Sequence, residues 1–149
     1  MPRYAPLALL TLSSLAVACD DDDPSDVAEG CRLEVAFLVN GEERCLTGSA
    51  ESTRLQAGTT TTITLNGGAG SETLEMFFVD LAEGDNLIPE NGARYVDPDG
   101  AVYSSGAGGR FTVSELDDDI DAEFSFTAEN LTDSVAVTRG VIENLQFRG

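Results

Sequence analysis

The chain has 149 residues, and its 27 acidic against 8 basic side chains give a formal net charge of −19 at pH 7. All the basic residues are arginines scattered singly, whereas nucleic acid is bound by clustered Lys and Arg, so we expect no nucleic-acid partner. Histidine is absent, which removes the usual general base and the commonest transition-metal ligand.

An apolar segment follows the N-terminus. Arg3 supplies a short positive start, residues 4–17 are rich in Leu and Ala, and Ala16-Val17-Ala18 has the small side chains of a signal-peptidase site. This order is typical of a secretory signal. The apolar run is shorter than the roughly 20 residues that a transmembrane helix needs. The sequence therefore predicts a signal peptide over residues 1–18.

Cys19 stands directly after this site, where the lipobox of bacterial lipoproteins places the cysteine that is acylated on its thiol. The lipobox usually has Leu three residues before the cysteine, whereas this chain has Ala16 there and Leu15 one place earlier. Cleavage by an ordinary signal peptidase is therefore the alternative. Residues 19–30 contain a run of four aspartates, with Pro and Gly but few bulky apolar residues. We predict a lipid on Cys19 and a disordered acidic tether over residues 19–30.

The remainder, residues 31–149, is predicted to be a single all-β domain. Leu33, Val35, Phe37 and Val39 fall on one face of the first predicted strand, and Asn40-Gly41 is a strong signal for a tight hairpin turn. The chain then returns through residues 44–46 as the second strand of this hairpin.

Later strands follow the same alternation. They are predicted at Thr60–Leu65, Thr73–Leu81, Ala93–Val96, Ala101–Ser104, Ile120–Glu129 and Val135–Phe147. Asp97-Pro98-Asp99-Gly100 is a predicted turn, and Gly140 a predicted bulge or bend. One apolar and one polar face at residues 120–129 indicate an antiparallel sheet. We expect an antiparallel meander of about eight to ten strands, forming a β-sandwich or a flattened barrel.

Both ends of this domain carry a recognisable pattern. The first stretch is VAFLVNGEE at 35–43; the second is DAEFSFTAEN at 121–130, followed by VAVTRGVIENLQF at 135–147. Together they resemble a family of small Bacteroidota lipoproteins of unknown function. That family typically has a lipidated Cys, an acidic tether, a Val-Asn-Gly hairpin, and GTFSFTA, Asn, then V-x-I-T-x-G-x-F-x-N-I. Ala122, Ile142 and Cys45 depart from its usual residues. The resemblance implies a membrane-anchored β domain outside the inner membrane and carries over no catalytic residues.

Cys31 and Cys45 are the two cysteines left once Cys19 is acylated, and an oxidising compartment favours a disulfide between them. The Asn40-Gly41 turn argues against it, because it pairs Cys45 with Ala36 and puts Cys31 on the opposite face. The bond then needs a bulge, or a Cys31 that folds back from the strand start. We predict the disulfide, with two separate buried thiols as the alternative.

Carboxylates are the remaining candidates for chemistry. Asp117, Asp118, Asp119 and Asp121 offer oxygen ligands suited to Ca²⁺, but their spacing is not that of an EF-hand. A solvated acidic turn that discourages edge-to-edge strand pairing is the preferred interpretation. Paired carboxylates can hydrolyse glycosides, but the chain has no Trp to stack on a sugar. We predict no catalytic residue, no metal site and no cofactor.

The expected function is a non-enzymatic binding or structural module, held by its lipid on the outer membrane and facing the cell exterior. Its ligand, an extracellular protein or glycan, would be contacted by loops such as 81–92 or 106–109. Tyr95 and Tyr103 are candidates for a contact patch, although strand tyrosines more often pack with their rings half buried. The alternative is a hydrolase acting on surface glycans or peptides, or an inhibitor of such an enzyme. A cleft of converging carboxylates would favour the enzyme.

Overall fold

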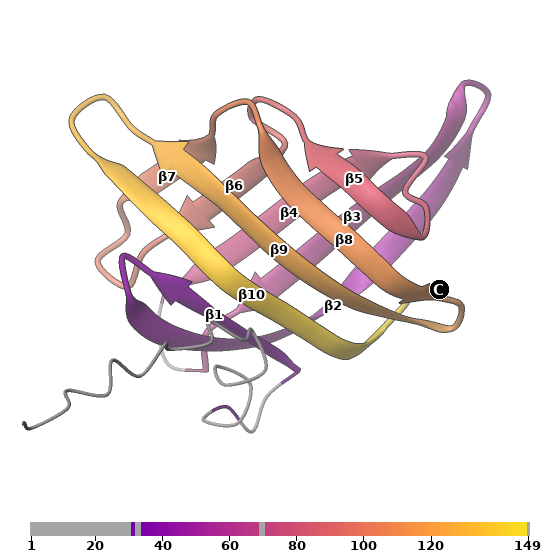
Figure 1. Cartoon of the computed structure of the whole chain (residues 1–149), viewed down its shortest axis with the longest axis horizontal. Coiled ribbons are helices and arrows are strands. Elements are labelled where there is room, and N and C mark those ends of the chain that lie inside the picture. Colours follow the sequence, from indigo (N-terminus) through magenta and orange to yellow (C-terminus); the bar gives the residue numbers. More distant parts are fainter. Residues whose placement is uncertain (1–30, 32–33, 69–70, 149) are drawn as a thin grey trace, which may run out of the picture.

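The computed structural model describes residues 31, 34–68 and 71–148 (Figure 1). The predicted signal peptide, Cys19 and the tether lie outside the described residues. The described part forms ten strands: β1 (Val35–Val39), β2 (Glu42–Leu55), β3 (Gly58–Asn66), β4 (Thr73–Val79), β5 (Gly84–Ile88), β6 (Ala93–Val96), β7 (Val102–Ser105), β8 (Gly109–Leu116), β9 (Asp119–Glu129) and β10 (Ser134–Gln146). None of the described residues forms a helix long and apolar enough to cross a bilayer.

Eight of the strands close into a ring. Its order is β10-β1-β2-β3-β4-β6-β7-β9, and β9 pairs in turn with β10. Every pairing between these strands is antiparallel. In Figure 1, β8, β9 and β10 lie in front of β2, β3 and β4, so the ring is flattened. The predicted all-β antiparallel meander of the sandwich or flattened-barrel type is confirmed.

The two remaining strands extend the front layer. β8 pairs with β9 from Ile120 to Ser125, beside the short pairing of β7 with residues 128 and 129. β5 pairs with β8 and ends the sheet. Sequence analysis missed both strands, and the segment 81–92, which was expected to be a loop, contains β5. The sequence signal for β5 is weak, because this strand (GDNLI) has only two large apolar residues.

Inward-facing side chains fill the ring. In β9 the buried residues alternate with exposed or half-buried ones from Ile120 to Ala128, as predicted. The ring centroid of Phe37 lies 5.9 Å from that of Phe124 and 6.3 Å from that of Tyr95. Phe78 and Phe111 pack at 4.6 Å. Aromatic burial of this kind contributes through both apolar area and ring geometry, so the interior is a packed core.

Two bulges in β10 let this strand pair on both of its edges. Its register against β9 shifts between Val137 and Gly140, and again between Ile142 and Leu145. Arg139 and Asn144 have φ of 52° and 54°, as bulge residues often do. A Cβ on Gly140 would lie 2.5 Å from the ring of Phe124. Glycine is therefore required there for packing, and the predicted bulge at Gly140 is confirmed.

Gly140→Ala should lower the free energy of unfolding by about 1–3 kcal/mol, because the added methyl group overlaps the ring of Phe124 in a filled core. Gly68→Ala is the matched control, since a Cβ there has nothing within 4 Å. Urea unfolding of both variants measures the difference. Equal stability of the two variants would show that the Phe124 ring can move aside.

Candidate functional site

Three strand connections meet at one end of the barrel, on the left in Figure 1. They are the β1–β2 turn at Asn40-Gly41, the β6–β7 turn at 97–101, and the β9–β10 loop at 130–133. Asn40 holds the first of them against β10, since its N–H donates to Ala136 O and its Oδ1 accepts from Ala136 N, at 2.9 and 2.8 Å. The connections surround a hollow of about 310 Å³, here called the loop-end hollow. Its polar lining includes Asn40, Glu42, Arg44, Asp97, Tyr103 and Asp133.

Side-chain oxygens set the shape of two of these connections. Asp97 Oδ1 accepts hydrogen bonds from the backbone N–H of Asp99 and Ala101, at 3.0 and 2.8 Å. Asn130 Oδ1 accepts from the N–H groups of Thr132 and Asp133, at 2.9 and 2.8 Å. These are the Asx turns that such residues favour. Asp97 therefore acts as the turn former that the sequence predicted.

A charged network forms the floor of the hollow. Arg44 lies opposite Phe37 in the β1–β2 hairpin, on the inward face of β2. Its Nη2 lies 2.9 Å from Glu42 Oε2, and its Nε lies 3.3 Å from Glu72 Oε1. Tyr95, which is fully buried, donates its hydroxyl to the same Glu72 oxygen at 2.7 Å. The guanidinium is thus neutralised from two sides where the core meets the hollow.

Burial decides the protonation of the tyrosines at this end. Burial raises the pKa of Tyr95 well above its ordinary value, and its hydrogen bond to Glu72 adds to the shift. Burial also raises the pKa of Tyr103, with further contributions from the charges of Asp97 and Asp133. Burial lowers the pKa of Arg44, but hydrogen bonds to Tyr95 and Glu42 and the charge of Glu72 leave it raised. Both phenols therefore stay protonated at neutral pH and cannot serve as bases.

The rim of the hollow is acidic. Glu42, Asp97, Asp99 and Asp133 bring four carboxylates to a space whose lining includes a single cation, Arg44. Negative potential in a concave site concentrates cations there. The hollow is therefore suited to a cationic group and unsuited to an anion.

Sequence reasoning located this site only in part. Tyr95 and Tyr103 are buried inside the barrel, so the suggested exposed contact patch is wrong and the packed alternative holds. Arg44 and Glu72 were missed. The hairpin register contained the signal for Arg44, because pairing Cys45 with Ala36 puts Arg44 on the inward face with Phe37. Nothing local marks Glu72, which lies just before β4.

The aspartates at 117–121 do not gather around a common point. Asp121 Oδ1 accepts from Asn144 N at 2.6 Å, and Asp119 Oδ2 accepts from Gln146 Nε2 at 3.3 Å. Both carboxylates thus hold the β8–β9 end against β10. In the described ranges, the one group of ligand atoms close enough to share an ion is Cys31, Glu43 and Cys45, and its two sulfurs are bonded to each other.

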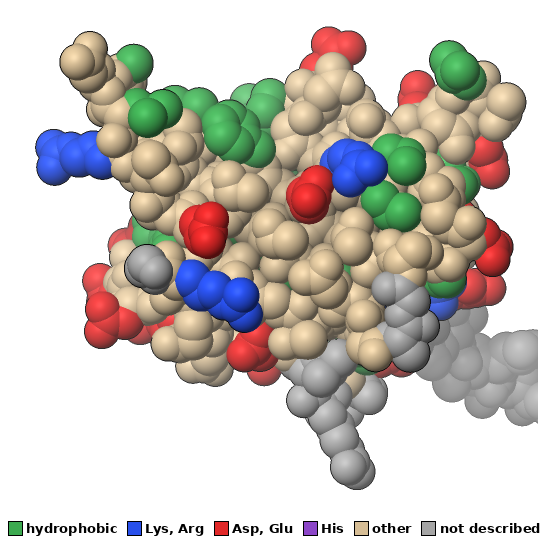
Figure 2. Space-filling view, turned by 180° about the vertical axis from the view of Figure 1, so that it is seen from behind, with side chains coloured by type: hydrophobic (Ala, Val, Ile, Leu, Met, Phe, Trp, Pro, Cys, Tyr) green, Lys and Arg blue, Asp and Glu red, His purple; other side chains and the backbone are tan. Residues whose placement is uncertain are grey.

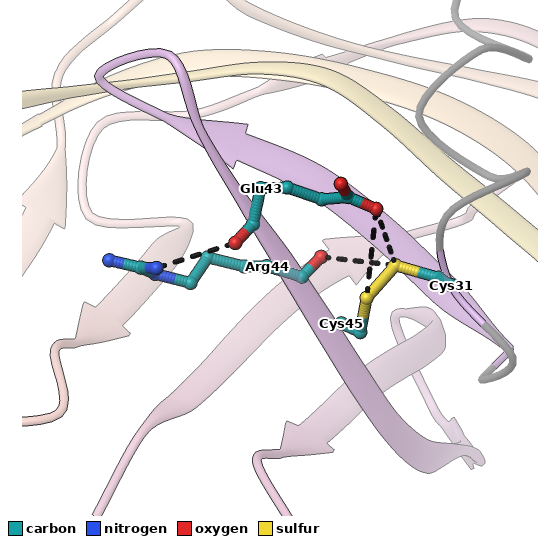
Figure 3. The surroundings of a disulfide bond; sticks show 4 residues. All are labelled: Cys31, Glu43, Arg44 and Cys45. Carbon is teal, nitrogen blue, oxygen red and sulfur yellow. Dashed lines mark hydrogen bonds between the residues drawn. A yellow bond between two sulfur atoms is a disulfide. The ribbon is translucent and has the colours of Figure 1, made fainter.

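A disulfide joins Cys31 to Cys45, with Cα atoms 5.7 Å apart (Figure 3). The expected register is present as well, with Ala36 opposite Cys45. Both can hold because β1 begins at Val35, so Cys31 precedes the strand and does not share its alternation. Glu43 Oε1 lies 3.4 Å from the sulfur of Cys31 and 4.0 Å from that of Cys45. A carboxylate beside the sulfurs disfavours a thiolate there.

The fold and the loop-end hollow define a filled, acidic β-barrel domain with a polar loop end. A family model described as a domain of unknown function (DUF6252) matches residues 46–146. The chain therefore belongs to this family. The matched range runs from β2 to β10 and leaves out Cys31, β1 and Cys45. No curated protein and no solved structure matches the chain.

Loss of the disulfide should lower the free energy of unfolding by about 2–4 kcal/mol, because the bond closes a loop with a sequence separation of 14. Cys45→Ser measures this in urea unfolding, and Cys19→Ser is the cysteine control. Alkylation of the exported protein without reductant, followed by mass spectrometry, should leave Cys31 and Cys45 unmodified. Alkyl groups on both residues would contradict the bond.

Alkaline pH should destabilise the protein through Tyr95. The unfolded phenol ionises near its ordinary pKa of about 10, whereas the folded phenol keeps its proton to higher pH. Stability from this group is therefore complete below pH 10 and falls as the pH rises above it. Tyr95→Phe should flatten this fall and cost about 1–3 kcal/mol at neutral pH, because Glu72 loses its donor. Tyr103→Phe is the comparison variant. Parallel curves of unfolding free energy against pH for wild type and Tyr95→Phe would rule this out.

Proposed function

We propose that this protein is a lipid-anchored, non-enzymatic binding module displayed on the cell surface, and that it contacts its ligand through the loop-end hollow. The observation that carries the proposal is the contrast between a packed interior and an acidic hollow ringed by three connections. A scaffold that positions surface loops without an inner cavity is typical of binding domains.

Two further features support the anchor and the compartment. Cys19 directly follows the small residues 16–18 after an apolar segment, as in lipoproteins. A disulfide suits an oxidising compartment, which an exported protein reaches. The resemblance to small Bacteroidota lipoproteins agrees with both and favours the outer membrane as the site of attachment.

The ligand we propose is a cationic group on an extracellular protein or glycan. The rim carries four carboxylates, whereas Arg44 is the one cation of its lining. The charge of Arg44 is already paired with Glu42 and Glu72. Long-range attraction between a chain of charge −19 and a cation would also speed the encounter at low ionic strength.

Labelling and crosslinking on intact cells test this proposal. Labelled palmitate should enter the wild type and not Cys19→Ala. A photoreactive side chain at exposed Asp99 should crosslink a partner, and spermine should compete with this crosslink. The same side chain at Glu51, exposed on β2 away from the hollow, is the control. Equal palmitate labelling of both proteins would overturn the anchor. Equal crosslinking from the two positions would overturn the loop-end hollow as the binding surface.

A further inference from the structure

Closure of the barrel leaves β5 outside the ring, with one edge open along its whole length. Each ring strand has a partner on both sides over part of its length, β8 lies between β9 and β5, and β5 is the last strand of the sheet. Among the described residues, nothing pairs with the other edge of β5. Open edges expose backbone N–H and C=O groups that can pair with another chain.

Exposed apolar side chains lie on β5 and on β4, the strand before it. Leu87 of β5 is 76% exposed, and Val79 and Phe77 of β4 are 61% and 45% exposed. The pairing of β4 with β6 ends at Met76, so the exposed part of β4 lies beyond it. Figure 2, seen from behind, shows several separate hydrophobic side chains in the upper part of the molecule, with polar and charged ones between them. Of these residues, Leu87 lies on the strand whose outer edge is open.

Charge selects the kind of chain that fits this edge. Asp80, Glu83, Asp85 and Glu90 lie on β5 or beside it, and all four are exposed. Asp80 accepts from Thr59 N and Asp85 from Thr112 Oγ1, so these two carboxylates are held in place. A second copy of this chain would bring the same carboxylates and its charge of −19 to the edge. Like charges therefore oppose self-pairing.

The length of the edge also limits its partner. β5 has five residues and is followed by Pro89, and the side chain of Asn86 already donates to Gly84 O at 3.0 Å and to Ala82 O at 2.7 Å. The free part of the edge is thus short, which suits a short peptide better than a full sheet.

We propose that an extended peptide that carries basic and apolar residues on one face adds as a strand to the free edge of β5. Backbone hydrogen bonds to the edge supply affinity, as in other cases of strand addition. Asp85 and Leu87 are two residues apart and both exposed, so they share the outer face of β5. On that face an apolar side chain of the peptide packs on Leu87 and a basic one meets Asp85. This surface is separate from the loop-end hollow, so the inference goes beyond the proposed function.

A short acetylated peptide of repeated Lys-Thr-Val-Thr, which puts Lys and Val on the same face of a strand, is the probe, added to the full-length disulfide-bonded protein in detergent. Binding should slow hydrogen exchange at β5 amides, measured by NMR, and should leave the amides of 97–101 unchanged. Leu87→Lys should weaken binding by about tenfold or more. Leu131→Lys is the matched control, because Leu131 is fully exposed in the distant β9–β10 loop.

Three results would overturn this inference. Protection at 97–101 in place of β5 would assign the peptide to the loop-end hollow. Equal binding of a peptide methylated on alternate backbone nitrogens would exclude strand pairing. Dimers in sedimentation equilibrium without peptide, lost in Leu87→Lys, would assign the edge to a second copy. Far-UV circular dichroism and melting of each variant confirm that it is folded. Binding of the peptide to β5 does not depend on a lipid at Cys19. A negative palmitate-labelling result would therefore overturn the proposed anchor without affecting the test of the β5 edge.

Discussion

Pairing of β9 with β10 holds the barrel closed, and the other features of the fold depend on it. β10 must follow β9 on one edge and β1 on the other, which its two bulges permit. The bulges in turn require Gly140, against which the ring of Phe124 packs, and Asn144, whose N–H is held by Asp121. Closure also determines which strands lie outside the ring. β8 pairs with part of the second edge of β9, and β5 is the last strand of the sheet.

The distribution of charge follows from this closed architecture. A packed apolar interior excludes carboxylates, so the acidic side chains are distributed over the surface and the connections, where water and ions screen them. One charged side chain does face inward: Arg44 places its guanidinium at the end of the barrel. Its burial is compensated by Glu42 and Glu72, and Tyr95 completes the hydrogen bonding of Glu72. The network both seals the core and forms the floor of the loop-end hollow.

The two surfaces considered for binding have different physical origins. The loop-end hollow arises where three connections meet above a charged floor, and it offers carboxylates to a compact cation. The edge of β5 arises because a strand was added outside the closed ring, and it offers backbone groups and Leu87 to an extended chain. For both surfaces the proposed partner is positively charged, since a chain with this excess of carboxylates repels anions at a distance.

Local signals in the sequence determined the strands other than β5 and β8, the first hairpin register, the Asp97 turn and the bulge at Gly140, because alternation, turn residues and glycine act over a few neighbouring residues. Only the tertiary structure decided that the meander closes, that β5 is left with a free edge, and that Arg44, Glu72 and Tyr95 meet. These depend on pairings between distant segments. The disulfide shows the same division: the register of Cys45 was readable from the turn, but where β1 begins, and thus whether Cys31 is bound by its alternation, was decided by the pairing of β1 with β2 and β10.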